Sequence, residues 1–351
     1  MPAHLLAIAS ATPPLDVHRD FIDWATARVR PDREPLFRRM AERAGIERRW
    51  SVLASPGGGS PVAPGGFYDT MPGTAVRMAR YAEAAPELAL AAVDALAAKR
   101  PLGTITHLVV ASCTGFVAPG LDQIVARRLG LDGSVERLLI GFMGCYAAVA
   151  ALRSARHIVR SEPTARVLVI ACELSTLHLQ DTDELEPLLA MLQFGDGAAA
   201  ALVAAEPDGF VLEAPFAATL PDSDSLIRWT ITDQGFAMHL SGEVPRRIGS
   251  ALAAPDFVDV VTAGRGPAGI DGWAVHAGGR SILDAVEHAL DLPPVALAAA
   301  RSVLADHGNM SSATLMFTLE RMLAGPRVDH GVALAFGPGL AAEGFGFRSA
   351  G

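Results

Sequence analysis

Cysteine is scarce in this chain, whose 351 residues include only Cys113, Cys145 and Cys172. Three widely spaced cysteines without a Cys-x-x-Cys pair do not form the pattern of a disulfide framework or of a zinc site. We therefore expect no metal. The same usage is typical of the reducing cytoplasm, which is the location that we predict.

Long apolar runs and an excess of basic residues are also missing. No apolar run reaches the roughly 18–20 residues that cross a membrane. The first ten residues lack the charged region that opens a signal peptide. The net charge of −9 gives no sign of the basic surface that binds nucleic acid. We expect neither a membrane nor a nucleic-acid partner, so an anionic substrate would need a local basic patch.

Apolar residues are abundant, since 50% of the chain is hydrophobic, 19% is charged and the mean hydropathy is +0.30. This composition is typical of a globular protein with a large core rather than of a disordered chain. The length suits two domains, or one large domain made of two halves.

Short apolar strands alternate with helical segments along the chain, which predicts an α/β protein with buried sheets. The expected strands are 4–10, 107–112, 166–172, 198–204, 272–276 and 331–336. The expected helices are 16–29, 33–46, 85–98, 119–129, 281–290 and 310–323, with a further helix directly after Cys145. Residues 54–66 are rich in proline and glycine and read as a loop.

Two stretches of the chain resemble each other. Gly115 precedes Cys145 by 30 residues, and Gly279 precedes Asn309 by the same 30 residues. Each interval runs from a glycine after a strand to a residue that opens a helix. This repeat predicts two pseudo-duplicated halves, 1–206 and 207–351, in five layers of the order αβαβα. The loops of the active site would gather where the halves meet.

Cys145 follows a glycine turn, Gly-Phe-Met-Gly at 141–144, and opens an alanine-rich helix. A thiol at a helix N-terminus lies near the positive end of the helix dipole and near unpaired N–H groups, and both favour the thiolate. Cys145 is therefore a candidate nucleophile. A buried structural cysteine is the alternative.

His276 ends a strand and is followed by Gly278 and Gly279, which would let a substrate or another chain segment come close. Asn309 precedes two serines at the start of a helix. Taken singly, His276 could be a histidine satisfied at a strand end, and Asn309 could be a helix N-cap. Together with Cys145, however, they form a set: a base for the thiol and two donors for a thioester oxyanion or an enolate.

Several motifs extend this set, and they span nearly the whole chain. They are 5–13 (LLAIASATP), 39–49 (RMAERAGIERR), 144–148 (GCYAA), 166–174 (RVLVIACEL), 194–200 (FGDGAAA), 276–279 (HAGG), 308–313 (GNMSSA) and 336–340 (FGPGL). In these motifs the chain resembles the type III polyketide synthases, the chalcone and stilbene synthase family, as a bacterial-type member. The resemblance implies the thiolase fold, a homodimer, and malonyl-CoA and an acyl-CoA starter as substrates, without a cofactor.

The resemblance also implies roles for individual residues. Cys145 would carry the starter as a thioester, while His276 and Asn309 would promote decarboxylation of malonyl-CoA and the condensation. Repeated extension and cyclisation would release a pyrone, a resorcinol or a related aromatic. Phe194 would be a gatekeeper of the cavity, and Met238 stands where the family has a second phenylalanine.

Further positions follow from the same resemblance. Arg39 and Arg43 would meet the CoA phosphates, but a third basic position is occupied by Leu36. The residues expected to bind or surround the substrate are Gly278, Ser311, Cys113, Thr114, Ser175 and His178. Cys113 and His178 replace residues that are usually threonine in the plant enzymes, and Ala118 replaces a larger residue at the dimer interface. These departures favour an aliphatic starter over a chalcone-type product.

Two alternatives remain open at this point. A 3-ketoacyl-acyl-carrier-protein synthase III-like enzyme would perform one condensation with the same kind of Cys, His and Asn, and dependence on a carrier protein would reveal it. A non-catalytic acyl-binding protein of the thiolase fold would bind acyl-CoA and leave it unchanged. A thiolase is disfavoured, because it needs a second catalytic cysteine near the C-terminus and none follows Cys172.

Overall fold

The computed structural model describes residues 1–54 and 59–351. Part of the loop expected at 54–66 therefore lies outside the described residues. The strands are β1 (Ala3–Ala11), β2 (Leu15–Asp16), β3 (Trp50–Ser51), β4 (His107–Ala111), β5 (Glu136–Ile140), β6 (Val167–Leu174), β7 (Asp196–Ala204), β8 (Phe210–Thr219), β9 (Ile227–Thr232), β10 (Gly235–Leu240), β11 (Gly272–Val275), β12 (Gly331–Gly337) and β13 (Ala341–Ser349).

Helices connect most of these strands. The α-helices are α1 (His18–Thr26), α2 (Glu34–Glu42), α3 (Thr74–Lys99), α4 (Leu121–Arg128), α5 (Ala147–Ser161), α6 (Leu185–Gln193), α7 (Val244–Leu252), α8 (Pro255–Thr262), α9 (Arg280–Ala289), α10 (Ala298–His307) and α11 (Ala313–Leu323). Short 3-10 turns are η1 (Gly144–Tyr146), η2 (Ser175–His178), η3 (Pro267–Gly269), η4 (Pro294–Leu297) and η5 (Pro338–Leu340).

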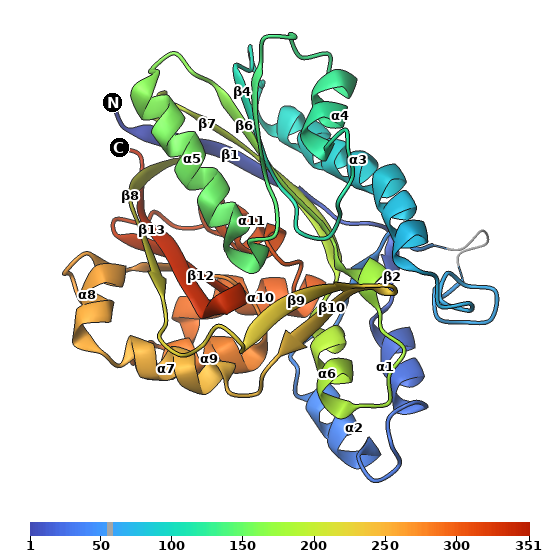
Figure 1. Cartoon of the computed structure of the whole chain (residues 1–351). Helices are drawn as coiled ribbons and strands as arrows, with labels where there is room; N and C mark the ends of the chain where they lie inside the picture. The colour runs from blue at the N-terminus through green and yellow to red at the C-terminus, as the bar shows by residue number, and fades with distance from the viewer. Residues whose placement is uncertain (55–58) are drawn as a thin grey trace.

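The main sheet has the strand order β11-β12-β13-β8-β1-β7-β6-β4-β5, so the two halves of the chain occupy its two ends. The first half contributes β1, β4, β5, β6 and β7, and the second half contributes the other four strands. Strand β8 joins them, because it pairs with both β1 and β13. Figure 1 shows the halves side by side, with the β9–β10 hairpin lying apart from the sheet near α6.

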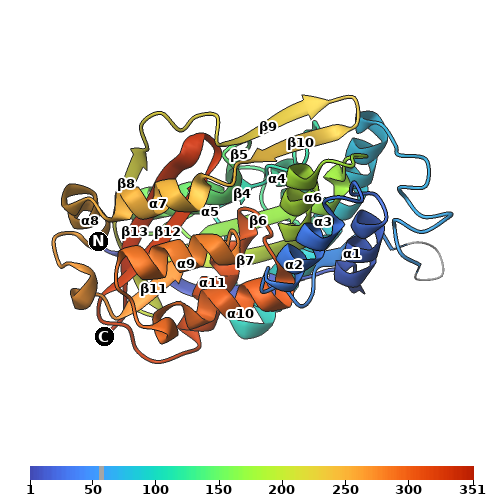
Figure 2. The same cartoon turned by 90° about the horizontal axis from the view of Figure 1, so that it is seen from below.

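Helices α5 and α11 lie between the two half-sheets and form the middle layer. Residues of both helices share one buried cluster with β4, β6 and β7 of the first half and with β12 and β13 of the second. The opposite faces of the strands pack on outer helices, with α3 on the first half and α9 and α10 on the second (Figures 1 and 2). This is the five-layered α/β arrangement of the thiolase fold, as the repeat predicted.

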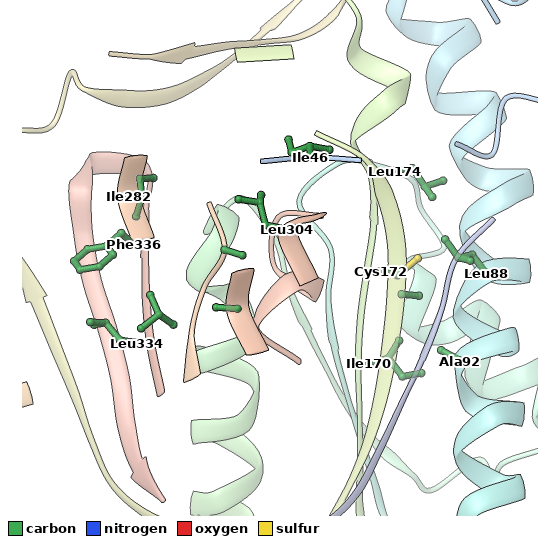
Figure 3. Packing of buried hydrophobic residues seen from close by; sticks show 14 of the residues in the cluster. Ile46, Leu88, Ala92, Ile170, Cys172, Leu174, Ile282, Leu304, Leu334 and Phe336 are labelled. Atoms are coloured by element: carbon green, nitrogen blue, oxygen red, sulfur yellow. The ribbon is translucent and has the colours of Figure 1, made fainter. Parts of the chain in front are cut away.

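Strand β6 is apolar at every position except Glu173, and its surroundings show why. Alternate residues point to opposite faces of a strand. Ile170 and Cys172 face α3, where Leu88 and Ala92 lie against them (Figure 3), while Val169 faces the middle layer. Because both faces are covered, no alternation of polar and apolar residues remains in such a strand.

Helix α3 is longer than the sequence indicated. We expected a helix over 85–98. The helix instead begins at Thr74 and runs through Pro86. Its buried stripe, which includes Tyr81, Ala85 and Ala89, extends on both sides of the proline. Packing of this stripe on the sheet offsets the hydrogen bond that an interior proline removes, a loss that otherwise costs about 3 kcal/mol.

Within residues 1–54 and 59–351, no helix combines the length and the apolar character needed to cross a membrane. The same ranges hold no group of three or more His, Cys, Asp or Glu side chains placed to bind a metal ion.

Candidate active site

Cys145 lies in the turn η1, directly before helix α5, as the motif predicted. Gly144 has φ +67°, and a Cβ on it would come within 2.5 Å of the Pro338 ring. A Cβ on Gly337 would meet the Tyr146 ring at 2.7 Å. The Phe-Gly-Pro-Gly motif at 336–339 therefore packs against the turn that carries the cysteine, and both glycines are needed for this close approach.

The Cys145 thiol is buried and protonated. Burial raises its pKa to about 12, Glu173 raises it as well, and hydrogen bonds with Ser311 and Asn309 lower it. The sequence had suggested a lowered pKa from the helix N-terminus. That expectation was wrong, because burial disfavours the charged form of the thiol more than the helix end favours it.

His276 directly follows β11, and its N–H continues the ladder by donating to the Leu334 carbonyl over 2.8 Å. The side chain is 2% exposed, and neither ring nitrogen has a hydrogen-bond partner among the residues that the structure describes. Burial lowers the pKa of the imidazole to about 3, so the ring is neutral. The reading as a locally satisfied histidine is therefore not supported, and both nitrogens remain available.

Asn309 lies four residues before α11 and is held by both ends of its side chain. Its Oδ1 accepts the Ser311 N–H over 2.8 Å, and its Nδ2 donates to the Gly278 carbonyl over 3.1 Å. These two bonds fix which way the amide points. The N-cap role considered from the sequence is not observed, because Ser312 is the N-cap of α11 and the helix has no side-chain cap hydrogen bond. Oδ1 instead holds the turn before the helix, while Nδ2 keeps one hydrogen for another acceptor.

These contacts bring the three candidates together. Asn309 contacts the Cys145 thiol, and its bond to Gly278 ties it to the loop that begins at His276. The backbone of Asn309 also pairs with Gln193 and Gly195, through bonds of 2.8 and 3.0 Å. Three segments that are more than 30 residues apart in the sequence therefore meet at one buried point.

A buried carboxyl group, Glu173, holds together the residues around the cysteine turn. It accepts the Cys113 N–H over 2.9 Å, the Thr114 hydroxyl over 2.8 Å and the Ser312 hydroxyl. Burial raises its pKa to about 7, against the lowering effect of these hydrogen bonds. Cys113 also accepts the Gly144 N–H over 3.0 Å. Cys113 and Thr114, expected around the substrate, thus belong to the support of the cysteine turn.

Phe194 lines a cavity, together with several other residues that the sequence predicted to surround the substrate. They are Met238, Ser175 and His178. Trp229, which lies opposite Met238 in the β9–β10 hairpin, also lines the cavity. The His178 ring stacks on Phe236 at 4.3 Å, accepts the Phe236 N–H and contacts the Thr114 carbonyl, so it anchors this hairpin.

A separate cleft reaches Gly278 and Gln193 from the surface. Its lining includes Arg43 together with three arginines that were not singled out from the sequence, namely Arg30, Arg33 and Arg280. Arg280 begins helix α9, and its Nη1 donates to the Arg43 carbonyl over 3.4 Å. Arg39 is exposed on α2 but is not among the residues that line the cleft.

Sequence reasoning missed Glu173, Trp229 and Arg280. A glutamate inside the otherwise apolar run 167–174 was a usable signal, because a carboxylate is almost never buried without partners. Arg280 directly follows the glycine pair of the histidine motif, which also could have drawn attention. Trp229 gave no local signal, since only the fold brings the hairpin over the cavity.

Comparison with known proteins gives a consistent result. Residues 2–207 match the family described as the N-terminal domain of chalcone and stilbene synthases, and residues 212–351 match the C-terminal domain. The chain is 34% identical to bisdemethoxycurcumin synthase of Oryza sativa subsp. japonica over 374 residues, covering 97% of this chain and 91% of that protein.

Solved structures are similar over the whole length. The crystal structure of PKS-I from the brown alga Ectocarpus siliculosus has a TM-score of 0.89 and 29% identity, covering 99% of this chain and 98% of that one. The C-terminal type III polyketide synthase domain of Steely1 from Dictyostelium has a TM-score of 0.91 and 24% identity, with 100% of both chains covered. The division at 1–206 and 207–351 stays a prediction.

Proposed function

The chain belongs to the chalcone and stilbene synthase family of type III polyketide synthases, and we propose that Cys145, His276 and Asn309 are its catalytic residues. As a member it is an acyltransferase that condenses malonyl-CoA units onto a CoA-linked starter. One observation carries the assignment: Asn309 contacts the Cys145 thiol and donates to the carbonyl of Gly278, two residues after His276. Both ring nitrogens of the buried His276 are without a hydrogen-bond partner among the residues that the structure describes.

Loading of the starter begins from a neutral pair, because the thiol has a pKa of about 12 and the imidazole of about 3. His276 takes the thiol proton as the Cys145 sulfur attacks the thioester carbonyl, so no stable thiolate is required. Collapse of the tetrahedral intermediate breaks the bond to CoA, and the imidazolium returns its proton to the leaving CoA sulfur. The starter is then a thioester of Cys145.

Extension uses the same groups in a second role. When malonyl-CoA loses carbon dioxide, the electron pair of the broken C–C bond forms an enolate of the remaining acetyl thioester. The enolate oxygen accepts hydrogen bonds from His276 and from the free Nδ2 hydrogen of Asn309, which stabilises the developing negative charge. The enolate carbon then attacks the acyl carbonyl on Cys145, and the Cys145 sulfur leaves.

The cleft at Gly278 suits the CoA part of the substrates. We place the phosphates against Arg43 and Arg280, with Arg30 and Arg33 nearby, rather than against Arg39. Arginine binds phosphate oxygens through its planar fork of donors. Arg280 thus supplies the cation that is missing at Leu36, from a different element of the fold.

Substitution tests this assignment of the phosphates. We expect Arg280→Met and Arg43→Met each to raise KM for malonyl-CoA by about 3- to 10-fold with little change in kcat, since each removes one charged contact. Arg39→Met is the matched control and is expected to leave KM within about twofold. A malonyl thioester of N-acetylcysteamine, which carries no phosphates, should show the same KM in all variants. An effect of Arg39→Met as large as that of Arg280→Met would contradict the placement.

We also propose that the chain forms a homodimer. Four large apolar side chains lie exposed at the edge strand β5 and beside the cysteine turn: Phe116, Leu138, Leu139 and Phe142. Phe116 and Phe142 are 70% and 53% exposed. The Phe116 and Phe142 rings lie 6.2 Å apart, and exposed apolar side chains that gather in this way are typical of an interface between subunits. A second copy would cover them and the open edge of the sheet.

The finer features of the product remain proposals. We propose a bacterial-type synthase of the cytoplasm that extends an aliphatic starter and cyclises the chain to a pyrone, a resorcinol or a related aromatic. Met238 and His178, where plant enzymes have other residues, support a cavity of different shape. The three free, buried cysteines agree with a reducing compartment.

Mass spectrometry of products tests the function. The purified chain is incubated with malonyl-CoA and a series of acyl-CoA starters of different length, without a carrier protein. We expect products two or more ketide units longer than the preferred starter. Activity that needs a malonyl-carrier protein and stops after one condensation would refute the iterative synthase. Light scattering on the same preparation should give twice the monomer mass, and a monomer would refute the dimer.

A further inference from the structure

The wall of the cavity behind Phe194 is mainly apolar. Helix α1, helix α6, the loop after β3 and the β9–β10 hairpin contribute to it. Its apolar lining includes Val17, Phe21, Leu53, Met191, Trp229 and Phe236. Figure 2 shows the hairpin at the rim of the molecule, beside α6 and α3. Such a wall fits the carbon skeleton of an acyl chain or an aromatic ring, but it does not distinguish one skeleton from another.

Most polar groups in this wall are already used within the protein. The Tyr68 hydroxyl donates to the Thr176 carbonyl, and the Thr176 hydroxyl donates to Asp196 over 2.7 Å. The Ser51 hydroxyl is bonded to the Thr176 hydroxyl over 2.8 Å. Both nitrogens of His178 have backbone partners. These groups therefore offer little to a ligand.

Two fully buried polar groups in the wall are not used, besides the partly exposed Asp20 carboxylate and Trp229 indole N–H that also line the cavity. The Arg49 Nη2 and the Ser175 Oγ are buried, line the cavity and have no hydrogen-bond partner within the described ranges. Arg49 itself is 2% exposed. A buried donor without an acceptor costs about 1–3 kcal/mol. An oxygen of a bound ligand would remove that cost.

The rest of the Arg49 guanidinium is fixed in place. Its Nε donates to His18 Nδ1 over 3.0 Å, and its Nη1 donates to the carbonyls of Met191 and Phe194 over 3.0 and 2.6 Å. Because the group is planar, these bonds also fix the direction of the Nη2 hydrogens. The donor is thus preorganised, and it is attached to the same segment as Phe194.

Arg49 also remains a cation at neutral pH. Burial lowers its pKa to about 10, while the charges of Asp16 and Asp196 favour the protonated form. The carboxylates are engaged elsewhere, since Asp16 accepts backbone N–H groups and Asp196 accepts from Thr176 and the Val52 N–H. Because Arg49 is buried, Coulomb attraction adds to the hydrogen bond that an oxygen acceptor would receive.

We propose that Arg49 is a specificity-determining binding residue, which holds an oxygen acceptor at the distal part of the acyl group while the apolar wall surrounds its carbon skeleton. The substrate class is therefore an acyl-CoA that carries a hydroxyl, carbonyl or carboxylate oxygen away from the thioester. Ser175 is a second donor to the same part of the chain. This assignment rests on the proposed function, and it specifies the starter that this function leaves open.

Matched pairs of acyl-CoA thioesters test the proposal in the loading step alone, before any malonyl-CoA is condensed. One pair is cinnamoyl-CoA and 4-hydroxycinnamoyl-CoA, which differ by a single neutral hydroxyl. The other is octanoyl-CoA and the mono-CoA thioester of octanedioic acid, which differ by a distal carboxylate. The rate of acyl loading on Cys145, without malonyl-CoA, is followed by intact-protein mass spectrometry. We expect at least one oxygenated member to load with kcat/KM about 10-fold or more above its partner.

Arg77 provides the matched control variant. Like Arg49, it is buried and donates through Nη1 to two backbone carbonyls, and its Nη2 has no partner among the residues that the structure describes. Arg77 does not line the cavity. The quantity compared is the loading rate of the oxygenated thioester divided by that of its unsubstituted partner. We expect Arg49→Met to bring this ratio close to one, and Arg77→Met to leave it at the wild-type value. Circular dichroism shows whether Arg49→Met folds. If it does not, the proposal is tested by the wild-type ratios of loading rates and by Ser175→Ala. We expect Ser175→Ala to lower the ratio between the oxygenated thioester and its partner.

The outcomes show which oxygen-bearing group of the starter Arg49 binds. Discrimination in the aromatic pair alone identifies a neutral hydroxyl as the partner of Arg49, and discrimination in the aliphatic pair identifies a carboxylate. Ratios near one in both pairs, or a ratio that survives Arg49→Met, would overturn the proposal while leaving the synthase intact. Failure of every thioester to load Cys145 would instead overturn the proposed function itself.

Discussion

Cys145→Ala abolishes polyketide formation but leaves the enzyme able to decarboxylate malonyl-CoA. Without the sulfur no starter can be held as a thioester, so we expect product formation to fall by about 10³-fold or more, as is usual when a nucleophile is removed. His276 and Asn309 remain in place to stabilise the enolate. The enolate then takes a proton from water, and acetyl-CoA accumulates. Chromatography of the CoA thioesters, with a parallel assay of released carbon dioxide, measures both results.

Cys172→Ala is the control for this experiment. Cys172 is also a buried cysteine, but it packs between β6 and α3, where its thiol donates to the Ala85 carbonyl over 3.5 Å. This change should lower the thermal stability slightly and leave the products unchanged. Polyketide formation by Cys145→Ala at the wild-type rate would show that Cys145 is not the nucleophile. Loss of decarboxylation to the background level would show that the thiol is needed in both steps.

Asn309→Asp is expected to have the second large effect, in the extension step. The aspartate keeps the oxygen that accepts the Ser311 N–H but loses the bond from Nδ2 to the Gly278 carbonyl, so circular dichroism must confirm that the variant is folded. It loses the Nδ2 hydrogen that we assign to the enolate, and its negative charge repels the enolate oxygen. Removal of one oxyanion donor costs about 10²- to 10³-fold in rate. We therefore expect decarboxylation and condensation to fall by at least that factor, as measured with a preloaded acyl-enzyme.

Asn309→Ala separates the two causes. It removes the donor without adding charge, so it should retain more activity than Asn309→Asp, although it leaves the Ser311 N–H without an acceptor and lowers the melting temperature. Equal rates in the two variants would mean that charge repulsion contributes nothing. Wild-type decarboxylation in Asn309→Asp would remove Asn309 from the mechanism and leave it with a structural role in the turn before α11.

The sequence determined the layered fold and the identity of the chemical groups. The strand expected at 166–172 is apolar at every position after Arg166, which is typical of a strand with both faces covered, and this property needs no knowledge of the neighbours. The equal intervals of 30 residues before Cys145 and before Asn309 indicated that the chain consists of two similar halves. The motifs around Cys145, His276 and Asn309 gave the family. Local signals suffice for these features because each depends on spacing, on glycine geometry or on residue type.

Only the tertiary structure decided the charge state of the catalytic thiol and the positions of the residues that we assign to substrate binding. The sequence suggested a thiolate at a helix end, but burial of Cys145 raises its pKa to about 12, and the degree of burial depends on segments from both halves. Arg280, Trp229 and Arg49 acquire their positions in the same way. Arg49 resembles any other arginine of the 39–49 motif until the fold encloses it beside Phe194 with one donor unused. Desolvation and unsatisfied hydrogen bonds are properties of an assembled interior, and no local pattern encodes them.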